Sequence, residues 1–223
     1  MKFRVTFQWI EPCPNERLRV AQQKLLESVE AMGLEPALFP AGPAMVKFGD
    51  VLRHARRESV GTSFLWCNSD VVLTQNPFTL ASRGKVQGFH RRELPSGDIC
   101  GGVDMYLIPN AIWDNYLSRD IPDLWCGGTH VDWWLTRAAA LIGAYESHVG
   151  FIDHLSHLES GASKSVTDPY YRHNLREYNA WAVRNGAGVL ELRIRLPLIG
   201  PSMSPITDYL KWVKRRLFRK DKP

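Results

Sequence analysis

A polar triplet, Asn68-Ser69-Asp70, interrupts an otherwise apolar part of the sequence. The apolar run 64–67 precedes it and another, 71–73, follows it. A diphosphate needs its negative charge offset, usually by a divalent cation that oxygen ligands hold. At a strand end, alternate residues can direct a carboxylate toward such a cation and a neighbouring polar group toward a ribose. A plain turn after a strand explains the same residues, so both interpretations stay open.

A second candidate is Asp132, which begins a predicted helix just beyond the pair Gly127-Gly128. A carboxylate within hydrogen-bond reach of an attacking alcohol can take its proton. The helix dipole alone also favours an acidic residue at this place. The next two residues, Trp133 and Trp134, are expected to frame an acceptor sugar, although one of them fits the core better.

Histidines gather late in the sequence, at positions 148, 154, 157 and 173. The spacing of His154 and His157 is that of half a zinc site, which would make the protein a metallohydrolase. The same residues would serve as late ligands of a metal shared with Asp70, or would simply lie on a surface loop.

Two further segments place polar groups beside predicted strands. Arg91 and Arg92 follow a strand, where guanidinium groups suit a phosphate or an acidic sugar. A solvated strand end explains them equally well. Asp104 follows Gly101-Gly102, and its carboxylate can bond sugar hydroxyls. The glycine pair can also simply permit a tight turn.

The elements that must position these residues alternate through the first seventy positions. This alternation predicts a mainly parallel sheet covered by helices. Ligands of such sheets bind beyond the carboxyl ends of the strands, where the triplet lies. Thr6 and Gln8, near the end of the first strand, are therefore expected to touch a nucleotide. Hydrophobic periodicity predicts strands at 2–10, 34–40 and 62–73, with helices at 16–32 and 46–58.

The second half has a different pattern. A polar loop is predicted at 154–163, and an extended Pro-rich segment at 190–205. Asp168-Pro169 has the composition of a helix cap and first helical residue. The other predicted elements are strands at 85–90, 103–108 and 144–151, and helices at 132–142, 168–185 and 207–220.

An apolar strand followed by Asn-Ser-Asp-Val resembles the variant DxD motif of GT-A-fold glycosyltransferases. The resemblance extends to the order of motifs over roughly residues 1–160: nucleotide half, triplet, acceptor strand, Gly-Gly loop with an acidic residue, and histidine loop. It implies an α/β fold with a GT-A-like, Rossmann-like mixed, mainly parallel sheet. It also implies transfer of a sugar from a nucleotide-diphosphate-sugar donor to a glycan or lipid-linked hydroxyl.

The resemblance implies a role for each matching residue. Asn68 stands where the motif's first Asp would be, and an amide is a weaker cation ligand than a carboxylate. Metal dependence, on Mn²⁺ or Mg²⁺, is expected but depends mainly on Asp70. The implied roles are donor binding for Asn68, Ser69 and Asp70, a base at Asp132, acceptor contacts from Asp104, Arg91, Trp133 and Trp134, and a late metal ligand at His154 or His157.

The net charge of +5 is confined to the C-terminal tail. Seven Lys or Arg residues and one Asp lie in the last thirteen positions, so the body is close to neutral and no nucleic-acid partner is expected. Residues 206–220 combine an apolar helical face with a basic one, which suits a helix lying on an anionic membrane. A packed helix or an RNA-binding tail fits the same pattern.

The domain expectation is a single catalytic domain at 1–205 followed by a basic amphipathic helix at 206–223. Four scattered cysteines and the lack of eighteen consecutive apolar residues indicate a cytoplasmic protein. The basic tail at 206–220 suggests that it is peripheral on the inner face of the cell membrane. Two other hypotheses stay open. One is a metal-dependent phosphate or nucleotide ester hydrolase, and the other is a non-enzymatic binding protein.

Overall fold

The computed structural model describes residues 3–13, 15–42, 45–126, 130–155 and 168–188. All of them fall in one compact unit, 1–191. The predicted domain boundary at 205 and the predicted helix at 206–220 lie outside the described residues. No helix among the described residues is both long and apolar enough to cross a bilayer.

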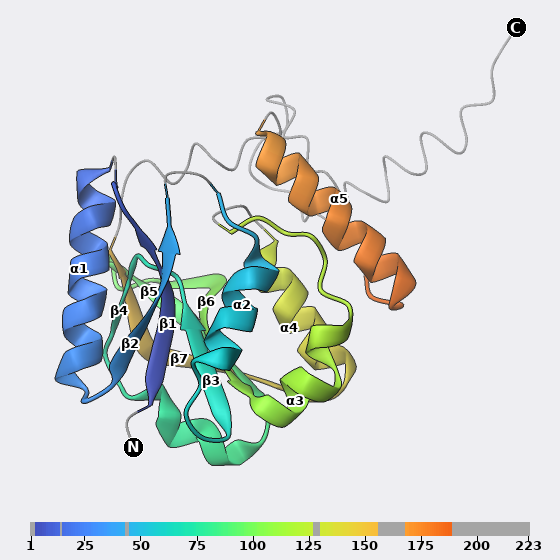
Figure 1. The fold of residues 1–223 in the computed structure, drawn as a ribbon, viewed down its shortest axis with the longest axis horizontal. Helices are drawn as coiled ribbons and strands as arrows, with labels where there is room; N and C mark the ends of the chain where they lie inside the picture. The colour runs from blue at the N-terminus through green and yellow to red at the C-terminus, as the bar shows by residue number, and fades with distance from the viewer. Residues whose placement is uncertain (1–2, 14, 43–44, 127–129, 156–167, 189–223) are drawn as a thin grey trace, which may run out of the picture. The chain divides into compact units, whose positions relative to one another are not determined.

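One mixed sheet organises the unit, with strand order β2-β1-β3-β6-β5-β7-β4 (Figure 1). β1 pairs in parallel with β2 and β3, and β5 with β7, whereas β6 and β4 run antiparallel to their neighbours. Five of the seven strands therefore point the same way, which confirms the predicted mainly parallel α/β class. The strands are β1 (Arg4–Ile10), β2 (Glu35–Ala41), β3 (Ser63–Cys67), β4 (Val71–Leu73), β5 (Val86–Leu94), β6 (Ile99–Pro109) and β7 (Tyr145–Leu155).

Helix ends follow local capping chemistry. The Asn15 side chain accepts a hydrogen bond from the Leu18 N–H, and Asp168 does the same for the Tyr170 N–H. Gly33, just past the first helix, has φ +70°, which glycine adopts without strain. The helices are α1 (Glu16–Ala31), α2 (Phe48–Arg57), α3 (Asn110–Asn115), α4 (Val131–Leu141) and α5 (Pro169–Arg184), with 3₁₀ turns η1 (Pro77–Arg83) and η2 (Leu117–Arg119).

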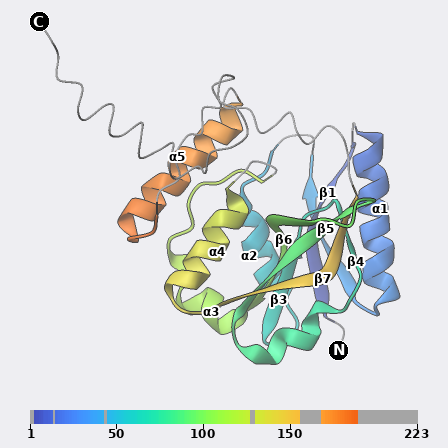
Figure 2. The same ribbon diagram turned by 180° about the vertical axis from the view of Figure 1, so that it is seen from behind.

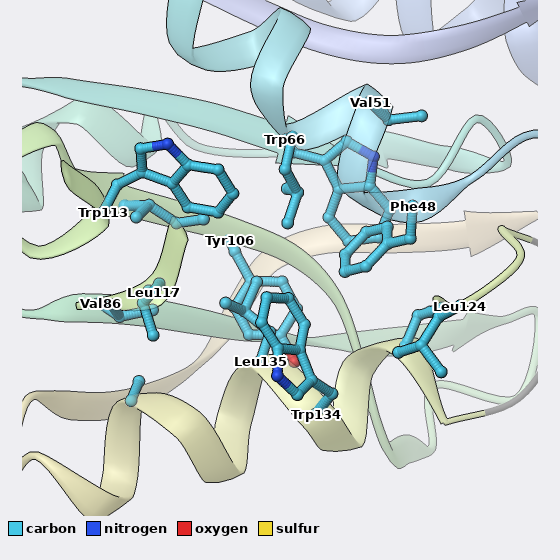
Figure 3. Close-up of a cluster of buried hydrophobic side chains, with 14 of the residues drawn as sticks. Phe48, Val51, Trp66, Val86, Tyr106, Trp113, Leu117, Leu124, Trp134 and Leu135 are labelled. Carbon is cyan, nitrogen blue, oxygen red and sulfur yellow. The ribbon is translucent and has the colours of Figure 1, made fainter. Parts of the chain in front are cut away.

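Helices cover both faces of the sheet, α1 on one and α2 with α4 on the other (Figures 1 and 2). Because successive strand residues point to opposite faces, β3 supplies both layers. Leu65 packs with Val5 and Leu25 on the α1 side. Trp66 packs on the other side, in a cluster that also holds Phe48 and Trp134 (Figure 3).

The cluster in Figure 3 corrects one prediction. Trp134 is completely buried, with its ring 6.0 Å from that of Phe48 in an edge-to-face contact. It is a core residue and cannot frame an acceptor, because the inward face of α4 carries it into the apolar layer.

The last strand is longer than predicted. β7 continues to Leu155, so His154 lies on a strand and not in a polar loop. Its polar end is stabilised by pairing with β5, where Arg92 lies opposite Asp153 and Glu93 opposite His154. Residues 156–163 of the predicted loop lie outside the described residues.

Candidate active site at the carboxyl edge of the sheet

The triplet lies where the chain leaves the middle of the sheet for its edge. β3 ends at Cys67 between β1 and β6, and β4 begins at Val71 beside β7. Because β1, β3, β5 and β7 share one direction, their carboxyl ends lie along the same side of the sheet, which we call its carboxyl edge. The triplet therefore runs along the carboxyl edge, from the β6 side to the β7 side.

Asn68 is fixed to β6 by two hydrogen bonds with one residue. Its backbone N–H donates to the Asp104 carbonyl at 2.8 Å, and its Nδ2 donates to Asp104 Oδ1 at 2.7 Å. The other carboxylate oxygen, Oδ2, accepts from Arg91 Nη1 at 2.8 Å. Both oxygens of Asp104 are thus used inside the protein, and the residue is only 6% exposed. The predicted direct contact of Asp104 with an acceptor is corrected: this carboxylate organises the site from within.

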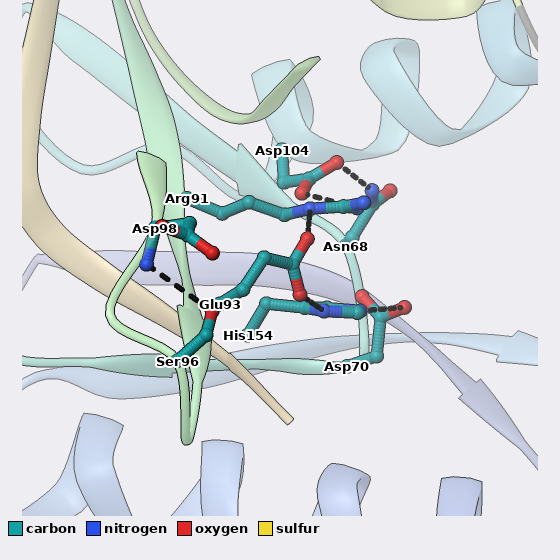
Figure 4. Close-up of polar contacts among 8 residues, drawn as sticks. All are labelled: Asn68, Asp70, Arg91, Glu93, Ser96, Asp98, Asp104 and His154. Atoms are coloured by element: carbon teal, nitrogen blue, oxygen red, sulfur yellow. Dashed lines mark hydrogen bonds and ion pairs between the residues drawn. The ribbon is translucent and has the colours of Figure 1, made fainter. Parts of the chain in front are cut away.

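Asp70 is fixed to β7 at the other end of the triplet. Its carbonyl accepts from the Leu155 N–H at 3.2 Å, and its Oδ2 lies 3.3 Å from His154 Nε2. The second nitrogen of His154, Nδ1, lies 2.6 Å from Glu93 Oε2 (Figure 4). The structure thus brings together Asp70 and His154, two of the three predicted metal ligands. His157 lies outside the described residues.

Arg91 connects the two ends. Its Nε donates to Glu93 Oε1 at 2.6 Å, in addition to its bond with Asp104. Six of the side chains drawn in Figure 4 are therefore connected in series, each held by the next. The connected side chains form a ring that begins and ends on the triplet: Asn68, Asp104, Arg91, Glu93, His154 and Asp70.

Burial and charge shift the pKa values around the ring. Burial raises the pKa of Asp104, Arg91 opposes that rise and Asp70 adds to it, with a net rise. Burial lowers the pKa of His154, but the interactions with Asp70 and Glu93 outweigh it, so the pKa is raised. Burial alone would raise the pKa of Glu93, yet His154 and Arg91 lower it overall. The interactions of the ring thus favour the charged forms of His154 and Glu93, whereas burial disfavours the ionised form of Asp104.

The residues present fit a divalent cation. Three carboxylates of the ring face one guanidinium and one imidazole, which leaves an excess of negative charge at the strand ends. Asp70 and His154 lie close enough together to share a ligand, and a hard cation completes its shell with phosphate oxygens and water. Across the described stretches of the chain, no three His, Cys, Asp or Glu side chains form a ready-made metal cage.

Asp132 lies in the first turn of α4, against β6. The Tyr106 hydroxyl donates to the Asp132 carbonyl at 2.7 Å and is 2.8 Å from Thr136 Oγ1, which ties the start of the helix to the strand. A Cβ at Gly102 would lie 3.9 Å from Asp132 Oδ2, so the carboxylate faces this glycine. Burial and the nearby Asp104 raise the pKa of Asp132 to about 6, despite bonds from backbone N–H groups that lower it.

The two tryptophans after Asp132 differ in exposure. Trp133 is 50% exposed, whereas Trp134 is fully buried. His130, just before the helix, has φ +83° and a ring 6.4 Å from that of Trp133. Trp133 therefore presents an aromatic surface one residue from the candidate base, and its acceptor contact remains a prediction.

The two residues of β1 that were predicted to contact a nucleotide also differ in exposure. Thr6 is 1% exposed, in the middle of the sheet between Ala37 and Trp66, so its predicted contact with a nucleotide is wrong. Gln8, two residues on, is partly exposed beside the triplet and interacts with the Cys126 thiol. Gln8 and Ser69, which is also partly exposed, stay predictions.

Sequence reasoning missed Glu93. It was passed over because it follows two arginines at a strand end, where charged residues are ordinarily solvated. The available signal was alternation: Arg91 and Glu93 share one side of β5. Of the other histidines, His148 pairs with Gln87 and His173 with the Asp123 carbonyl, so neither belongs to the ring.

Neither a protein-family model nor a curated protein matches the sequence. Among solved structures, the chain is similar to S. aureus TarS 1-349 in complex with UDP-GlcNAc, at 13% identity and a TM-score of 0.55, over 81% of this chain and 66% of that one. It is also similar to a glycosyltransferase involved in glycosylation of the major capsid of PBCV-1, at 12% identity and a TM-score of 0.46, over 73% and 97%.

A third similar structure is a mutant Drosophila beta-1,4-galactosyltransferase 7 in complex with manganese, UDP-Gal and xylobiose, at 8% identity and a TM-score of 0.43, over 70% and 71%. The TM-scores of the PBCV-1 and Drosophila structures are too low to add to the argument. The likeness to TarS shows that the chain has the GT-A-like fold, as the resemblance predicted.

Proposed function

We propose that the protein is a glycosyltransferase that moves a sugar from a nucleotide-diphosphate-sugar to the hydroxyl of a glycan or lipid-linked acceptor. The observation that carries the proposal is the pairing of Asp70 with His154 at the carboxyl edge of a GT-A-like sheet. The triplet crosses from β3 to β4 at this edge, which is where α/β sheets bind nucleotides.

Asp70 and His154 are the residues that would hold a divalent cation, Mn²⁺ or Mg²⁺. Bound there, such a cation supplies offsetting charge for the departing diphosphate. The side-chain nitrogen of Asn68, Nδ2, is bonded to Asp104. We propose that the side-chain oxygen, Oδ1, contacts the donor. Ser69 and Gln8 are the neighbouring polar groups proposed to contact the nucleoside. Arg91, which is mostly covered and bonded to two carboxylates, balances charge beside the donor.

Asp132 is the proposed base. It takes the proton of the acceptor hydroxyl as the hydroxyl oxygen attacks the anomeric carbon. A pKa of about 6 leaves it ionised at neutral pH, yet more basic than an exposed aspartate. The half-exposed ring of Trp133 offers the adjoining sugar an apolar face.

In this proposal the C-terminal tail brings the protein to the membrane surface where the acceptor lies. Residues 206–220 combine an apolar and a basic face in sequence. We place the protein in the cytoplasm, peripheral on an anionic membrane surface, where a lipid-linked acceptor would be presented.

A thermal-shift screen tests the proposal. UDP, GDP, dTDP and CMP are each added with and without Mn²⁺. A nucleotide that binds only the folded protein stabilises it by mass action and so raises its melting temperature. At a nucleotide concentration a hundredfold above Kd, the free energy of unfolding increases by about 2.7 kcal/mol. One of the four is expected to stabilise the protein, more strongly with Mn²⁺. The proposal fails if none does.

A further inference from the structure

We propose that Glu93 is a positioning residue, which orients the His154 imidazole so that Nε2 is presented to a cation held with Asp70. The inference rests on the proposed function, because it concerns the same cation. Nothing in the sequence motifs points to Glu93, and the geometry of the ring alone assigns it this role.

The first argument is the division of labour between the nitrogens of His154. Nδ1 lies 2.6 Å from Glu93 Oε2, whereas Nε2 lies 3.3 Å from Asp70 Oδ2. An ionised carboxylate can only accept, so Nδ1 carries the proton toward Glu93. When a cation takes the place of the proton on Nε2, the shorter contact with Glu93 keeps the remaining proton on Nδ1 and leaves Nε2 as the ligand. A carboxylate behind a ligating imidazole fixes ring orientation and increases basicity in metal sites generally.

The second argument is that Glu93 is itself held from behind. Its other oxygen, Oε1, accepts from Arg91 Nε at 2.6 Å. Arg91 in turn is bonded to Asp104, and Asp104 to Asn68. The orientation of His154 is therefore tied to the backbone of the triplet that carries Asp70. A side chain restrained at both oxygens can hold its neighbour more firmly than a solvated glutamate.

The third argument comes from strand register. Glu93 lies directly opposite His154 in the parallel pairing of β5 with β7. Arg92 and Asp153, one residue earlier on each strand, form their own ion pair at 2.8 and 2.9 Å. Since neighbouring strand residues point to opposite sides, that pair faces away from His154. It offers a matched control of similar chemistry at nearly the same position.

Glu93→Gln tests the proposal. The glutamine keeps one acceptor oxygen and gains an NH₂ group, so it must turn that group toward either the Arg91 N–H or the His154 N–H. Binding of Mn²⁺ alone is measured by counting free Mn²⁺ with electron paramagnetic resonance. We expect Glu93→Gln to weaken Mn²⁺ binding about 10- to 100-fold. Asp153→Asn should leave the affinity within about twofold of the wild type.

A double-mutant cycle separates positioning from general destabilisation. If Glu93 acts through His154, Glu93→Gln should have no further effect on Mn²⁺ affinity once His154→Gln is present. The melting temperature of each metal-free variant is recorded alongside. Glu93→Gln binding Mn²⁺ as the wild type does, or adding its full effect in the His154→Gln background, would overturn the inference and leave the proposed function standing. Wild-type protein that binds no Mn²⁺ would instead count against the metal in the proposed function, and this inference would fall with it.

Discussion

At the scale of single residues, the presence of an amide and not a carboxylate at position 68 has a structural reason. The side-chain nitrogen of Asn68 donates to Asp104 Oδ1 at 2.7 Å. An aspartate at position 68 would bring a second carboxylate to that distance from buried Asp104, where like charges raise pKa values and cost stability. Asn68 is therefore the partner that a buried Asp104 requires, and Asp70 is the one carboxylate of the triplet that the proposed function assigns to the donor.

We predict that Asn68→Asp, which would give the triplet the DxD pattern that it resembles, destabilises the protein. The new carboxylate removes a hydrogen bond and leaves a like-charge contact, at a cost of about 1–3 kcal/mol at pH 8. Urea unfolding measures the change. The exchange Asn68→Asp with Asp104→Asn restores one donor and one carboxylate to the pair, and should recover part of the loss. An Asn68→Asp protein as stable as the wild type at pH 8 would contradict the assignment.

A second residue-scale prediction concerns pH. Burial and Asp104 raise the pKa of Asp132 to about 6 in the folded protein, above the value of about 3.9 in an unfolded chain. Protonated Asp132 thus makes its full contribution to the free energy of unfolding below about pH 4, and this contribution is lost as pH rises through about 6. Asp132→Asn should unfold at the same urea concentration as the wild type at pH 4 and be about 1–3 kcal/mol more stable at pH 8.

The same substitution should abolish most transfer activity, because a general base typically contributes about 10²- to 10⁴-fold. In the wild type, kcat/KM should rise with pH and level off above about 6, since the base acts when ionised. Urea titrations at the two pH values and a pH–rate profile measure both effects. If Asp132→Asn stabilised the protein equally at pH 4 and pH 8, ionisation of Asp132 would not be what destabilises the wild type at pH 8.

At the scale of elements, the sequence allowed the first half to be predicted closely. Strand and helix at 2–10 and 16–32 match β1 and α1, because alternation, the Asn15 cap and Gly33 are all local signals. The carboxyl end of β7 was not predictable in the same way. Polar Asp153 and His154 interrupt its apolar residues, and pairing with two strands far earlier in the sequence, β5 and β4, makes this segment a strand.

The residues of the site also differ in whether local sequence signals predict them. Asn68, Asp70 and Asp132 could be found from sequence because each lies next to a buried strand or a helix start. For Glu93, alternation indicates only that it shares one side of β5 with Arg91. Its contact with His154 across two strands has no local pattern. Burial also had to come from packing: Thr6 and Trp134 looked available in sequence and lie inside the protein.

The contact between β6 and α4 carries an element-scale prediction. Tyr106→Phe removes the hydroxyl that bonds the Asp132 carbonyl and Thr136. We expect a loss of about 1–2 kcal/mol together with a lower kcat, because the first turn of α4 holds the base. Stabilisation by nucleotide and Mn²⁺ should not change, since Asp70 lies on another element.

A matched control is Ser28→Ala, which removes a hydroxyl on α1 that accepts from the Leu73 N–H at 3.1 Å. It should cost comparable stability and leave kcat unaltered. Chemical denaturation and transfer kinetics on both variants provide the comparison. Equal losses of kcat in the two variants would show that activity tracks stability and not the position of α4.

At the scale of the whole molecule, one crossing of the chain assembles the site. The triplet joins the centre of the sheet at β3 to its edge at β4, and in doing so brings Asn68 to β6 and Asp70 to β7. The resemblance to GT-A-fold enzymes implied the class of sheet, mixed and mainly parallel, whereas the order of the strands comes from the structure. Periodicity alone predicts alternating elements without their arrangement.

The basic tail carries a whole-molecule prediction. The net positive charge of the chain comes from the residues after position 210, and each cation near an anionic bilayer contributes about 1 kcal/mol. Full-length protein should float with anionic vesicles, less so at high salt, and should not float with neutral ones. Protein truncated after Pro205 should remain in solution. Equal flotation of the truncated protein would place the membrane contact elsewhere.

Calorimetric titration of a nucleoside diphosphate into the protein tests the central claim most directly. The nucleotide is the one that gives the largest thermal shift, and the titration is run with and without Mn²⁺ on wild type and on Asp70→Asn. We predict that Mn²⁺ tightens binding to the wild type at least tenfold, about 1.4 kcal/mol, and has little effect on Asp70→Asn. Equal binding by the two proteins in Mn²⁺ would show that the triplet is a turn and not a donor site.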